Sequence, residues 1–170
     1  LRLILFAGDV MPPRQLRSLM QTIPDARWFN LYGPTETNVC TWYEVAKAPA
    51  EDQPRIPIGK ACKNFELLIA GQDGQPVQAG QAGELWVRGP ALMTGYWSRP
   101  RENAACFAPN PTQPVLYGDR FYRTGDRVLR EADGNLLFLG RLDDSEQVYR
   151  EVLDRREIAL GQDHPQTLTT

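Results

Sequence analysis

Residues 30–37 read Asn-Leu-Tyr-Gly-Pro-Thr-Glu-Thr, and they decide how the first forty residues are interpreted. The run 28–32 is apolar and aromatic, as in a buried strand, and a Gly-Pro pair ends it. Upstream, residues 1–6 form a nearly continuous apolar run that predicts a strand covered on both faces. Between the two strands, Pro12-Pro13 opens a stretch with apolar residues at helical spacing. The order strand, helix, strand predicts a parallel α/β sheet.

The same stretch carries side chains suited to a nucleotide. We expect a strand-to-helix junction here, because such a junction presents free backbone N–H groups to an anion. Gly33 would let a ligand approach the main chain, and Tyr32 offers a ring on which a base can stack. Thr35 and Glu36 would hold a phosphate and its magnesium ion. The alternative is structural, with Pro34 opening a helix whose first turn favours Thr35 and Glu36.

Beyond Pro49 the pattern predicts a β-rich subdomain. Short apolar runs are separated by turn residues, and they cover 65–70, 84–88, 121–129 and 136–139. Asp73-Gly74 and Asp133-Gly134 are typical of hairpin turns. A short helix is expected over residues 100–106. The fold class is therefore α/β, with the end of a parallel sheet followed by this β-rich part.

The chain changes character again near Asp144. A capping arrangement of Asp144 and Gln147 precedes apolar residues at helical spacing, and Gly161 is placed to end that helix. Acidic residues outnumber basic ones in this last part, whereas basic residues are in slight excess before it. We therefore divide the chain into residues 1–143 and a helical segment, residues 144–170.

The composition argues against several function classes. A formal net charge of −2 with scattered Arg and Lys gives no basic stripe for nucleic acid. Neither a membrane span of ~20 apolar residues nor a secretion leader is visible. One histidine, His164, builds neither a histidine-rich metal site nor a hydrolase triad. Cys40, Cys62 and Cys106 are too far apart for a metal knuckle and indicate reduced, mostly buried thiols, so we expect a cytoplasmic protein.

Two later motifs place charged residues after turns. Residues 121–126 read Phe-Tyr-Arg-Thr-Gly-Asp, and the two oxygens of Asp126 would accept both hydroxyls of a ribose. The alternative is that Asp126 stabilises its own turn. Residues 140–143 read Gly-Arg-Leu-Asp and offer Arg141 as a fixed cation beside an acid. By itself this pair would also fit a surface ion pair of little energetic weight.

The order of these motifs resembles a known family. Tyr-Gly-Pro-Thr-Glu-Thr at 32–37 is followed by Gly-Glu-Leu-Trp-Val-Arg-Gly at 83–89, Gly-Tyr-Trp at 95–97, Tyr-Arg-Thr-Gly-Asp at 122–126 and Gly-Arg-Leu-Asp at 140–143. In this order they resemble the core motifs of the adenylate-forming (AMP-binding) superfamily. They are most similar to the amino-acid adenylation domains of nonribosomal peptide synthetases, and the resemblance covers residues 1–143.

The resemblance implies roles for individual residues. Tyr32 matches the adenine-stacking aromatic beside Gly33, and Asp126 matches the ribose-binding carboxylate. Thr35 corresponds to the hydroxyl that touches the phosphate, and Glu36 to the acid that holds magnesium. The nucleotide-contacting arginine is Arg141, and the hinge position is Asp143. Positions that line the side-chain pocket are Leu5, Ala7, Leu31, Val39 and Cys40, all apolar or small, so a hydrophobic substrate side chain is expected.

The resemblance also implies a reaction. In the family a carboxylic or amino acid attacks the α-phosphate of magnesium-bound ATP, giving an acyl-adenylate and pyrophosphate. A phosphopantetheine thiol on a carrier protein then takes the acyl group and displaces AMP. Two parts of the family pattern are absent from the sequence, the Ser/Thr/Gly-rich phosphate loop and the lid that carries a catalytic lysine. We therefore expect a partial adenylation domain that keeps the nucleotide half-site and is inactive on its own.

The tail resembles a second family. Tyr-Arg-Glu-Val-Leu at 149–153 and Ala-Leu-Gly-Gln-Asp-His-Pro at 159–165 are similar to a kinesin-light-chain-type tetratricopeptide repeat. Such repeats are helix pairs that bind partner proteins and require stacked neighbours. The alternative function is therefore a protein-interaction module, with a protein partner on the tail and a degenerate ligase portion.

Overall fold

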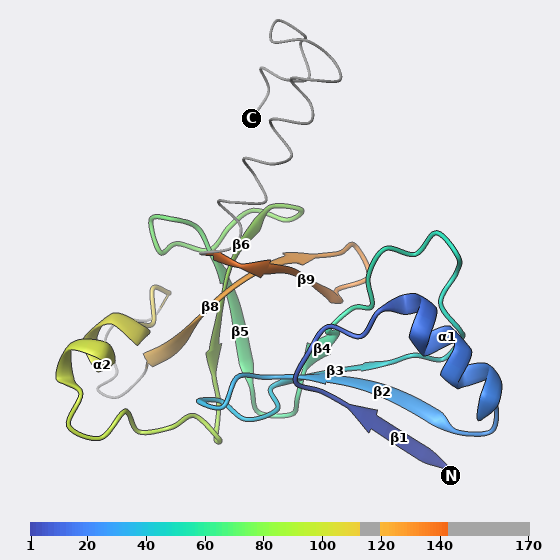
Figure 1. Ribbon diagram of the computed structural model, residues 1–170. Coiled ribbons are helices and arrows are strands. Elements are labelled where there is room, and N and C mark those ends of the chain that lie inside the picture. The colour runs from blue at the N-terminus through green and yellow to red at the C-terminus, as the bar shows by residue number, and fades with distance from the viewer. Residues whose placement is uncertain (113–119, 143–170) are drawn as a thin grey trace, which may run out of the picture.

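The computed structural model describes residues 1–112 and 120–142, which form two β-sheets and two helices (Figure 1). The first sheet has the order β1-β2-β3-β4. Its strands are β1 (Leu3–Phe6), β2 (Arg27–Tyr32), β3 (Thr41–Glu44) and β4 (Lys60–Ala61). The second sheet has the order β5-β6-β8-β7, with β9 paired to β8. Its strands are β5 (Glu66–Ala70), β6 (Ala82–Arg88), β7 (Phe107–Pro109), β8 (Arg120–Arg130) and β9 (Leu136–Arg141).

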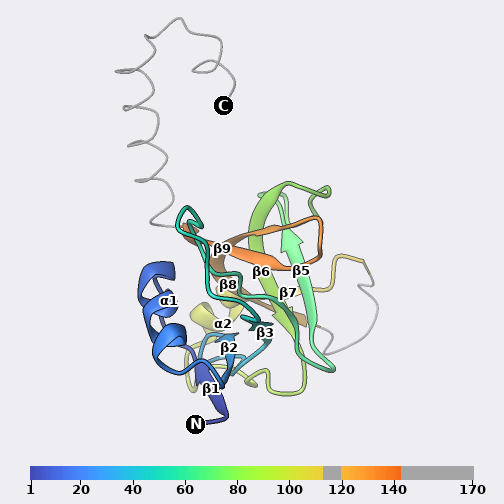
Figure 2. The same ribbon diagram turned by 90° about the vertical axis from the view of Figure 1, so that its right-hand side faces the viewer.

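The expected strand–helix–strand unit is present at the start of the chain. β1 and β2 are parallel, and helix α1 (Pro13–Thr22) connects them. In two views related by a quarter turn, α1 lies along one side of the first sheet (Figures 1 and 2). The helix starts on a proline in its first turn, where no N–H partner is needed. Leu16 is fully buried against Trp28, Val45 and Ile56, so one helical face and one sheet face form a core cluster.

The other face of the first sheet is open. Leu3 and Leu5 of β1 are 52% and 56% exposed, and Trp42 of β3 is 43% exposed. Alternate residues of a strand point to opposite faces, which is why these side chains face away from α1. The expectation that residues 1–6 are covered on both faces is therefore wrong for the described residues.

The expected strand-to-helix junction at 33–37 is also wrong. A tight turn replaces the helix: the amide of Thr37 donates to the carbonyl of Pro34 at 3.1 Å. Asn38 has φ 56°, a left-handed conformation that stops a helix from propagating. The chain then reverses into β3, which pairs antiparallel with β2. The pattern around Pro34 marks a turn between strands, and no helix N-terminus faces the site here.

The β-rich expectation for the middle of the chain is confirmed. β5, β6, β8 and β9 pair antiparallel in succession, and the turn at Asp133-Gly134 joins β8 to β9 as a hairpin. Asp133 accepts the amide of Asn135 at 2.9 Å, the side-chain contact that makes Asp favourable in such turns. Helix α2 (Pro100–Cys106) occupies the expected range, with Glu102 in its first turn. It lies at the far end of the molecule from α1 (Figure 1).

A second core cluster joins the two sheets. Cys40 and Ile58 come from the segments that flank β3, and they pack on residues of the second sheet, namely Ile69, Leu85, Val87, Val128 and Leu136. The backbone joins them as well, because the amides of Ile58 and Leu136 donate to the carbonyls of Leu136 and Gly59, each at 2.8 Å. The contact between the sheets is thus both apolar and hydrogen-bonded, and it fixes where β2 ends relative to β8 and β9.

The three cysteine thiols differ in how deeply they are buried, and none of them forms a disulfide. Cys40 is fully buried, and burial raises the pKa of its thiol to about 12, whereas Cys62 and Cys106 are half-buried. Because the thiolate is the reactive form, we expect Cys40 to react with a thiol reagent at pH 8 at least about tenfold more slowly than the other two. Mass spectrometry of timed labelling checks this. Equal rates at all three thiols in the folded chain would contradict the burial of Cys40.

Two sequence expectations fall on the C-terminal segment. The helix over 144–161 and the hinge position Asp143 lie outside the described residues. Among residues 1–112 and 120–142, no helix is both long and apolar enough to span a bilayer.

Candidate functional site

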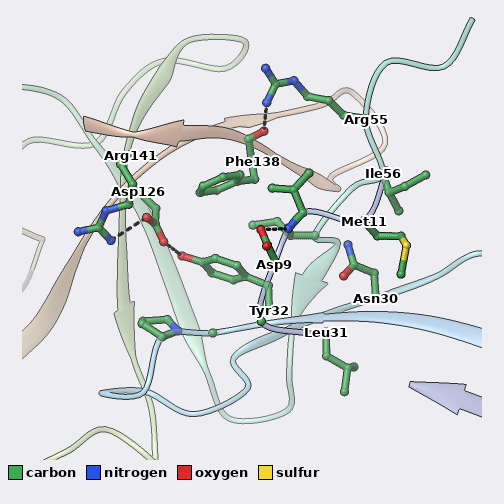
Figure 3. A pocket seen from close by; sticks show the side chains of 15 residues that line it. Asp9, Met11, Asn30, Leu31, Tyr32, Arg55, Ile56, Asp126, Phe138 and Arg141 are labelled. Atoms are coloured by element: carbon green, nitrogen blue, oxygen red, sulfur yellow. Dashed lines mark hydrogen bonds and ion pairs between the residues drawn. The ribbon is translucent and has the colours of Figure 1, made fainter. Parts of the chain in front are cut away.

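A cavity of about 300 Å³ lies where the end of β2 meets β8 and β9 (Figure 3). This volume is at the lower end of the range for small-molecule sites. Its walls come from four parts of the chain: residues 8–11, residues 30–34, residues 55–58, and Asp126, Phe138 and Arg141 of the second sheet. The cavity is therefore assembled across the contact between the two sheets, from residues far apart in the sequence.

Tyr32 and Phe138 form an aromatic wall of the cavity. Their ring centroids lie 6.2 Å apart with a tilt of 38°. The hydroxyl of Tyr32 donates a hydrogen bond to Oδ2 of Asp126 (Figure 3). Burial, and after it the charge of Asp126, raises the pKa of Tyr32 above its ordinary value, so this hydroxyl stays protonated and acts as a donor. The ring is thereby held in one orientation.

Asp126 is the central acid of the cavity. It is 6% exposed, and its Oδ1 accepts a hydrogen bond from Nη1 of Arg141 at 2.9 Å. The same guanidinium donates to the carbonyl of Thr124 at 2.8 Å. The two residues meet because Asp126 of β8 and Arg141 of β9 are directly paired across the sheet. An ionised carboxylate has about four lone-pair sites, so bonds to Tyr32 and Arg141 leave capacity for two further donors.

This geometry decides between the alternatives for Asp126 and Arg141. Asp126 does not merely stabilise its own turn, because its carboxylate reaches to Tyr32, 94 residues away in the sequence. Arg141 is not an isolated surface ion pair either, since its partner acid is almost completely buried. Four of the five residues expected to contact the nucleotide line one cavity, namely Tyr32, Gly33, Asp126 and Arg141. The fifth, Thr35, lies outside its lining.

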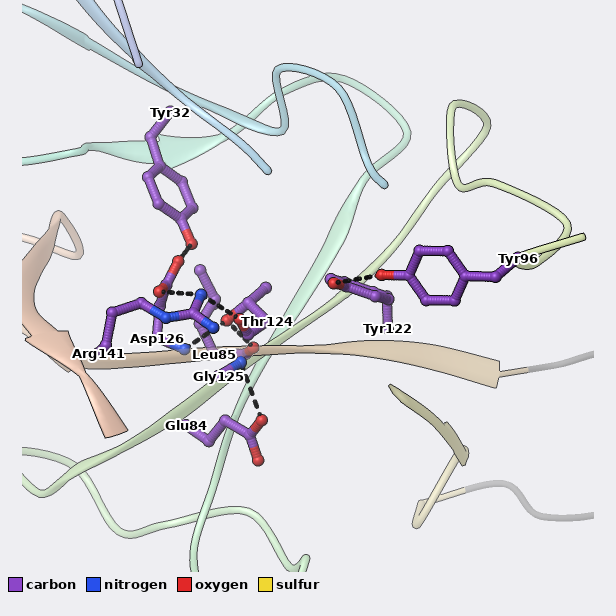
Figure 4. Close-up of polar contacts among 9 residues, drawn as sticks. All are labelled: Tyr32, Glu84, Leu85, Tyr96, Tyr122, Thr124, Gly125, Asp126 and Arg141. Atoms are coloured by element: carbon purple, nitrogen blue, oxygen red, sulfur yellow. Dashed lines mark hydrogen bonds and ion pairs between the residues drawn. The ribbon is translucent and has the colours of Figure 1, made fainter. Parts of the chain in front are cut away.

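Glu36 belongs to a separate cluster beside this cavity. The hydroxyl of Tyr96 donates to Oε1 of Glu36, and it lies 3.5 Å from the hydroxyl of Tyr122, as Figure 4 shows for the two tyrosines. Burial raises the pKa of Glu36, but the Tyr96 hydrogen bond and others outweigh burial and hold that pKa below its ordinary value. Glu36 is therefore ionised at neutral pH. Thr35, in the same turn, is exposed.

The residues around Glu36 fit magnesium only together with a phosphate. Among the described residues, no group of three or more His, Cys, Asp or Glu side chains converges on a point. A single ionised carboxylate satisfies one position of the octahedral oxygen shell that Mg²⁺ requires. Mg²⁺ commonly completes this shell with water and the phosphates of its substrate, so Glu36 suits an ion that arrives with a nucleotide.

Gly33 is required for a different reason from the one expected. A Cβ at this position would lie 1.8 Å from the carbonyl oxygen of Asn38 and 2.9 Å from the amide of Cys40. The absent side chain thus makes room for the protein's own turn between β2 and β3. Gly33 also lines the cavity, so the same residue serves the turn and the cavity wall.

The five residues expected around a substrate side chain do not share one surface. Leu5 and Leu31 line a shallow apolar hollow on the open face of the first sheet, together with Phe29 and Trp42. Ala7 is exposed, Val39 is half-buried, and Cys40 is inside the core. The structure therefore brings together Leu5 and Leu31, whereas Cys40 lies in the core cluster that joins the two sheets.

Sequence reasoning missed several residues of the site. Asn30 lines the cavity, and its side chain donates to the carbonyl of Pro57 at 2.8 Å, which ties β2 to the segment 55–58. Phe138 was expected only as part of an apolar strand. Tyr96 and Tyr122 lie in motifs that the sequence analysis identified, but neither was assigned a role. Tyr96 is 60 residues from Glu36 in the sequence, so their hydrogen bond could not be predicted from local spacing. Of these residues, only Asn30 could have been identified from the sequence, because it is a polar residue at the start of the stretch 30–37.

Comparisons with known proteins agree with the site. Residues 1–97 match the family described as AMP-binding enzyme. The chain is 38% identical over 98% of its length to an L-proline--[L-prolyl-carrier protein] ligase of Pseudomonas fluorescens, and 38% identical over 95% to a linear gramicidin synthase of Brevibacillus parabrevis. The N-terminal subdomain of NpsA from Klebsiella oxytoca, solved in complex with 3-hydroxybenzoyl-AMSN, superposes with a TM-score of 0.71 at 29% identity over 82% of this chain and 35% of that one.

Residues 135–166 also match a tetratricopeptide repeat family. This match begins at β9 (Leu136–Arg141), which the structure shows as a strand of the second sheet, so the repeat pattern does not describe residues 136–141. The alignment with the prolyl-carrier ligase covers 98% of the chain and thus takes in most of the same tail.

The chain matches only part of the length of each relative. The chain spans 30% of the prolyl-carrier ligase and 3% of the gramicidin synthase. The fold neighbour confirms the expected α/β class of a partial adenylate-forming domain. The resemblance to adenylation domains of nonribosomal peptide synthetases is likewise confirmed, and the chain belongs to the AMP-binding enzyme family.

Proposed function

We propose that residues 1–142 form the adenosine-binding half of an ATP-dependent site that activates a carboxylic or amino acid. The observation that carries this proposal is the contact of Tyr32, Asp126 and Arg141 across one cavity. An aromatic ring, a buried carboxylate with spare acceptor capacity and a fixed cation are the groups needed for a base, a ribose and a phosphate. The membership of the AMP-binding enzyme family supports the same assignment.

Each residue has a defined task in this proposal. Tyr32 stacks on the adenine, and its bond to Asp126 keeps the ring from turning away. Asp126 accepts the two ribose hydroxyls on lone pairs that Tyr32 and Arg141 leave available. Arg141 holds the Asp126 carboxylate in place and supplies positive charge on the phosphate side.

The phosphate side involves Glu36 and Thr35. Glu36 holds the magnesium ion that accompanies ATP, and the hydroxyl of Tyr96 orients its carboxylate. Mg²⁺, when bound, neutralises charge that develops on the phosphates. Thr35 is exposed beside Glu36, so its hydroxyl is accessible to a phosphate oxygen.

The acid substrate and the acceptor are further parts of the proposal. Of the five residues expected around a substrate side chain, Leu5 and Leu31 supply an apolar wall, because they line one hollow, whereas Ala7, Val39 and Cys40 lie outside that hollow. The acyl group then passes to the phosphopantetheine thiol of a carrier protein, and AMP is released. The name of the prolyl-carrier relative includes a carrier protein for that enzyme. The reduced thiols of the chain fit a cytoplasmic location.

The tail supports a second candidate function. The tetratricopeptide match over residues 135–166 favours a protein-interaction module in which the nucleotide half-site is degenerate. In the leading candidate the hinge position is Asp143, and for both candidates we propose a division between residues 1–143 and 144–170. Binding of AMP to the chain separates them, because a degenerate site predicts none.

Calorimetric titration with adenosine and AMP tests the leading proposal. We expect both to bind, since the described contacts serve base and ribose. Replacing Tyr32 with leucine removes the stacking ring and should weaken AMP binding by about tenfold, because stacking on an aromatic contributes ~1–3 kcal/mol. The matched variant Tyr32→Phe keeps the ring and loses only the hydroxyl bond, so its loss should be smaller. The proposal fails if neither ligand binds, or if Tyr32→Leu binds AMP as tightly as the unaltered chain.

A further inference from the structure

Strand β8 carries an irregularity at the nucleotide site. Glu84 of β6 pairs with Arg127 of β8, and Trp86 pairs with Arg123. Between these two pairs β6 has one residue, Leu85, whereas β8 has three, residues 124–126. The surplus residues push β8 outward as a bulge, and bulges characteristically redirect side chains next to functional sites. Asp126, the proposed ribose acid, is the last residue of this bulge.

Side chains satisfy the backbone groups that the bulge removes from the ladder. The amide of Gly125 donates to Oε1 of Glu84 at 3.0 Å, so a side-chain carboxylate takes the place of a strand carbonyl (Figure 4). The hydroxyl of Thr124 donates to the carbonyl of Leu85 at 2.7 Å and accepts the amide of Asp126 at 3.0 Å. Buried amides require such partners, so the bulge keeps its shape only while Glu84 and Thr124 hold it.

Glu84 is itself fixed by several donors. The residue is 8% exposed, and its Oε2 accepts the indole N–H of Trp86 at 2.8 Å. The same oxygen accepts Nε and Nη2 of Arg123 at 3.2 and 3.1 Å. A buried acid with this many partners is costly, and well-packed apolar residues would stabilise a sheet as well. A buried carboxylate at this position is accounted for if it shapes the bulge.

We propose that Glu84 is a positioning residue for the nucleotide site: it holds Gly125 in the β8 bulge and so aims the Asp126 carboxylate at the ribose. In Figure 4 Glu84 approaches the bulge from the side opposite to Tyr32, so it acts on Asp126 through the backbone and does not touch the ligand. The inference rests on the proposed function, because it assumes that Asp126 accepts ribose hydroxyls.

The test compares AMP with 2′,3′-dideoxy-AMP, which lacks the hydroxyls that Asp126 would accept. The unaltered chain is expected to bind AMP about tenfold more tightly than the dideoxy compound in calorimetry. The variant Glu84→Gln, which presents an amide N–H₂ to donors, should reduce that ratio to about twofold. The control is Glu66→Gln, which breaks an arginine pair with Arg88 on the exposed part of the same sheet and should keep the full ratio. An unchanged ratio in Glu84→Gln would overturn the proposal.

A second variant is tested in case Glu84→Gln does not fold, and a second measurement is made that does not depend on nucleotide binding. Glu84→Asp keeps the charge beside Arg123 but withdraws the carboxylate from Gly125. It should therefore also reduce the ratio of the affinities for AMP and the dideoxy compound. If neither variant folds, the role of Glu84 is in stability alone. Hydrogen exchange of the Gly125 amide needs no ligand and should accelerate by at least about tenfold in either folded variant. An unchanged exchange rate refutes the role of Glu84, whereas equal affinities of the unaltered chain for the two nucleotides refute the proposed function.

Discussion

Replacing Asp126 with asparagine is expected to weaken AMP binding by about 30-fold. We expect this to be the largest effect on AMP binding of any substitution at the site that preserves the shape of the side chain. The amide has one acceptor oxygen where the carboxylate has two, and its N–H₂ group faces donors. Tyr32 and Arg141 already occupy one lone pair on each carboxylate oxygen, so the variant cannot satisfy them and both ribose hydroxyls together. Calorimetric titration with AMP measures the loss.

The control for Asp126 is Asp133→Asn. Asp133 lies in the exposed turn between β8 and β9, where it bonds only to Asn135 among the contacts described, so AMP affinity should change less than about twofold. Because Asp126→Asn also breaks the pair with Arg141, its melting temperature must be measured alongside. Retention of full AMP affinity by a folded Asp126→Asn variant would remove Asp126 from the site.

Replacing Gly59 with alanine is expected to lower the free energy of unfolding by about 3–5 kcal/mol, through positive-φ strain and a backbone clash. Gly59 has φ 84°, and a Cβ there would lie 1.9 Å from the carbonyl oxygen of Trp42. The clash cannot be relieved by a side-chain rotation, since Trp42 meets it with backbone atoms. Gly59 also accepts the Leu136 amide that joins the two sheets, so a shift would open the cavity between them.

Gly80→Ala is the matched control for this substitution. Gly80 has nearly the same φ, 82°, but nothing lies within 4 Å of its Cβ position. Its cost should be confined to backbone strain, about 1–2 kcal/mol. Equilibrium denaturation by urea measures both losses. Equal losses for the two glycines would show that the close approach to Trp42 carries no energetic weight.

The elements that follow local rules could be predicted from the sequence. The α1 unit follows from apolar residues at helical spacing after Pro12-Pro13, and the β8–β9 hairpin follows from Asp133-Gly134. The turn at Pro34 was misjudged because proline opens turns as readily as helices, and only Asn38, in a left-handed conformation, shows which one forms.

Contacts between distant parts of the chain could not be predicted in the same way. The motifs identified Tyr32 and Asp126 separately, but the hydrogen bond between them depends on how the two sheets meet. The roles proposed for Glu84 and Tyr96 depend on a bulge register and on a contact with Glu36, neither of which leaves a periodic signal. The open face of β1 was missed because an apolar run predicts burial and does not show whether a neighbour is present to provide it.

The most direct test of the central claim is nuclear magnetic resonance of the ¹⁵N-labelled chain during titration with AMP. We expect saturable shifts of the amides of Tyr32, Gly33, Asp126 and Arg141, which line the cavity from both sheets. Amides at the ends of β2 and β3 away from the cavity, such as those of Arg27 and Glu44, should not move. Saturable shifts confined to residues outside the cavity, or none at AMP concentrations in the millimolar range, would contradict the account of an adenosine site held by Tyr32 and Asp126.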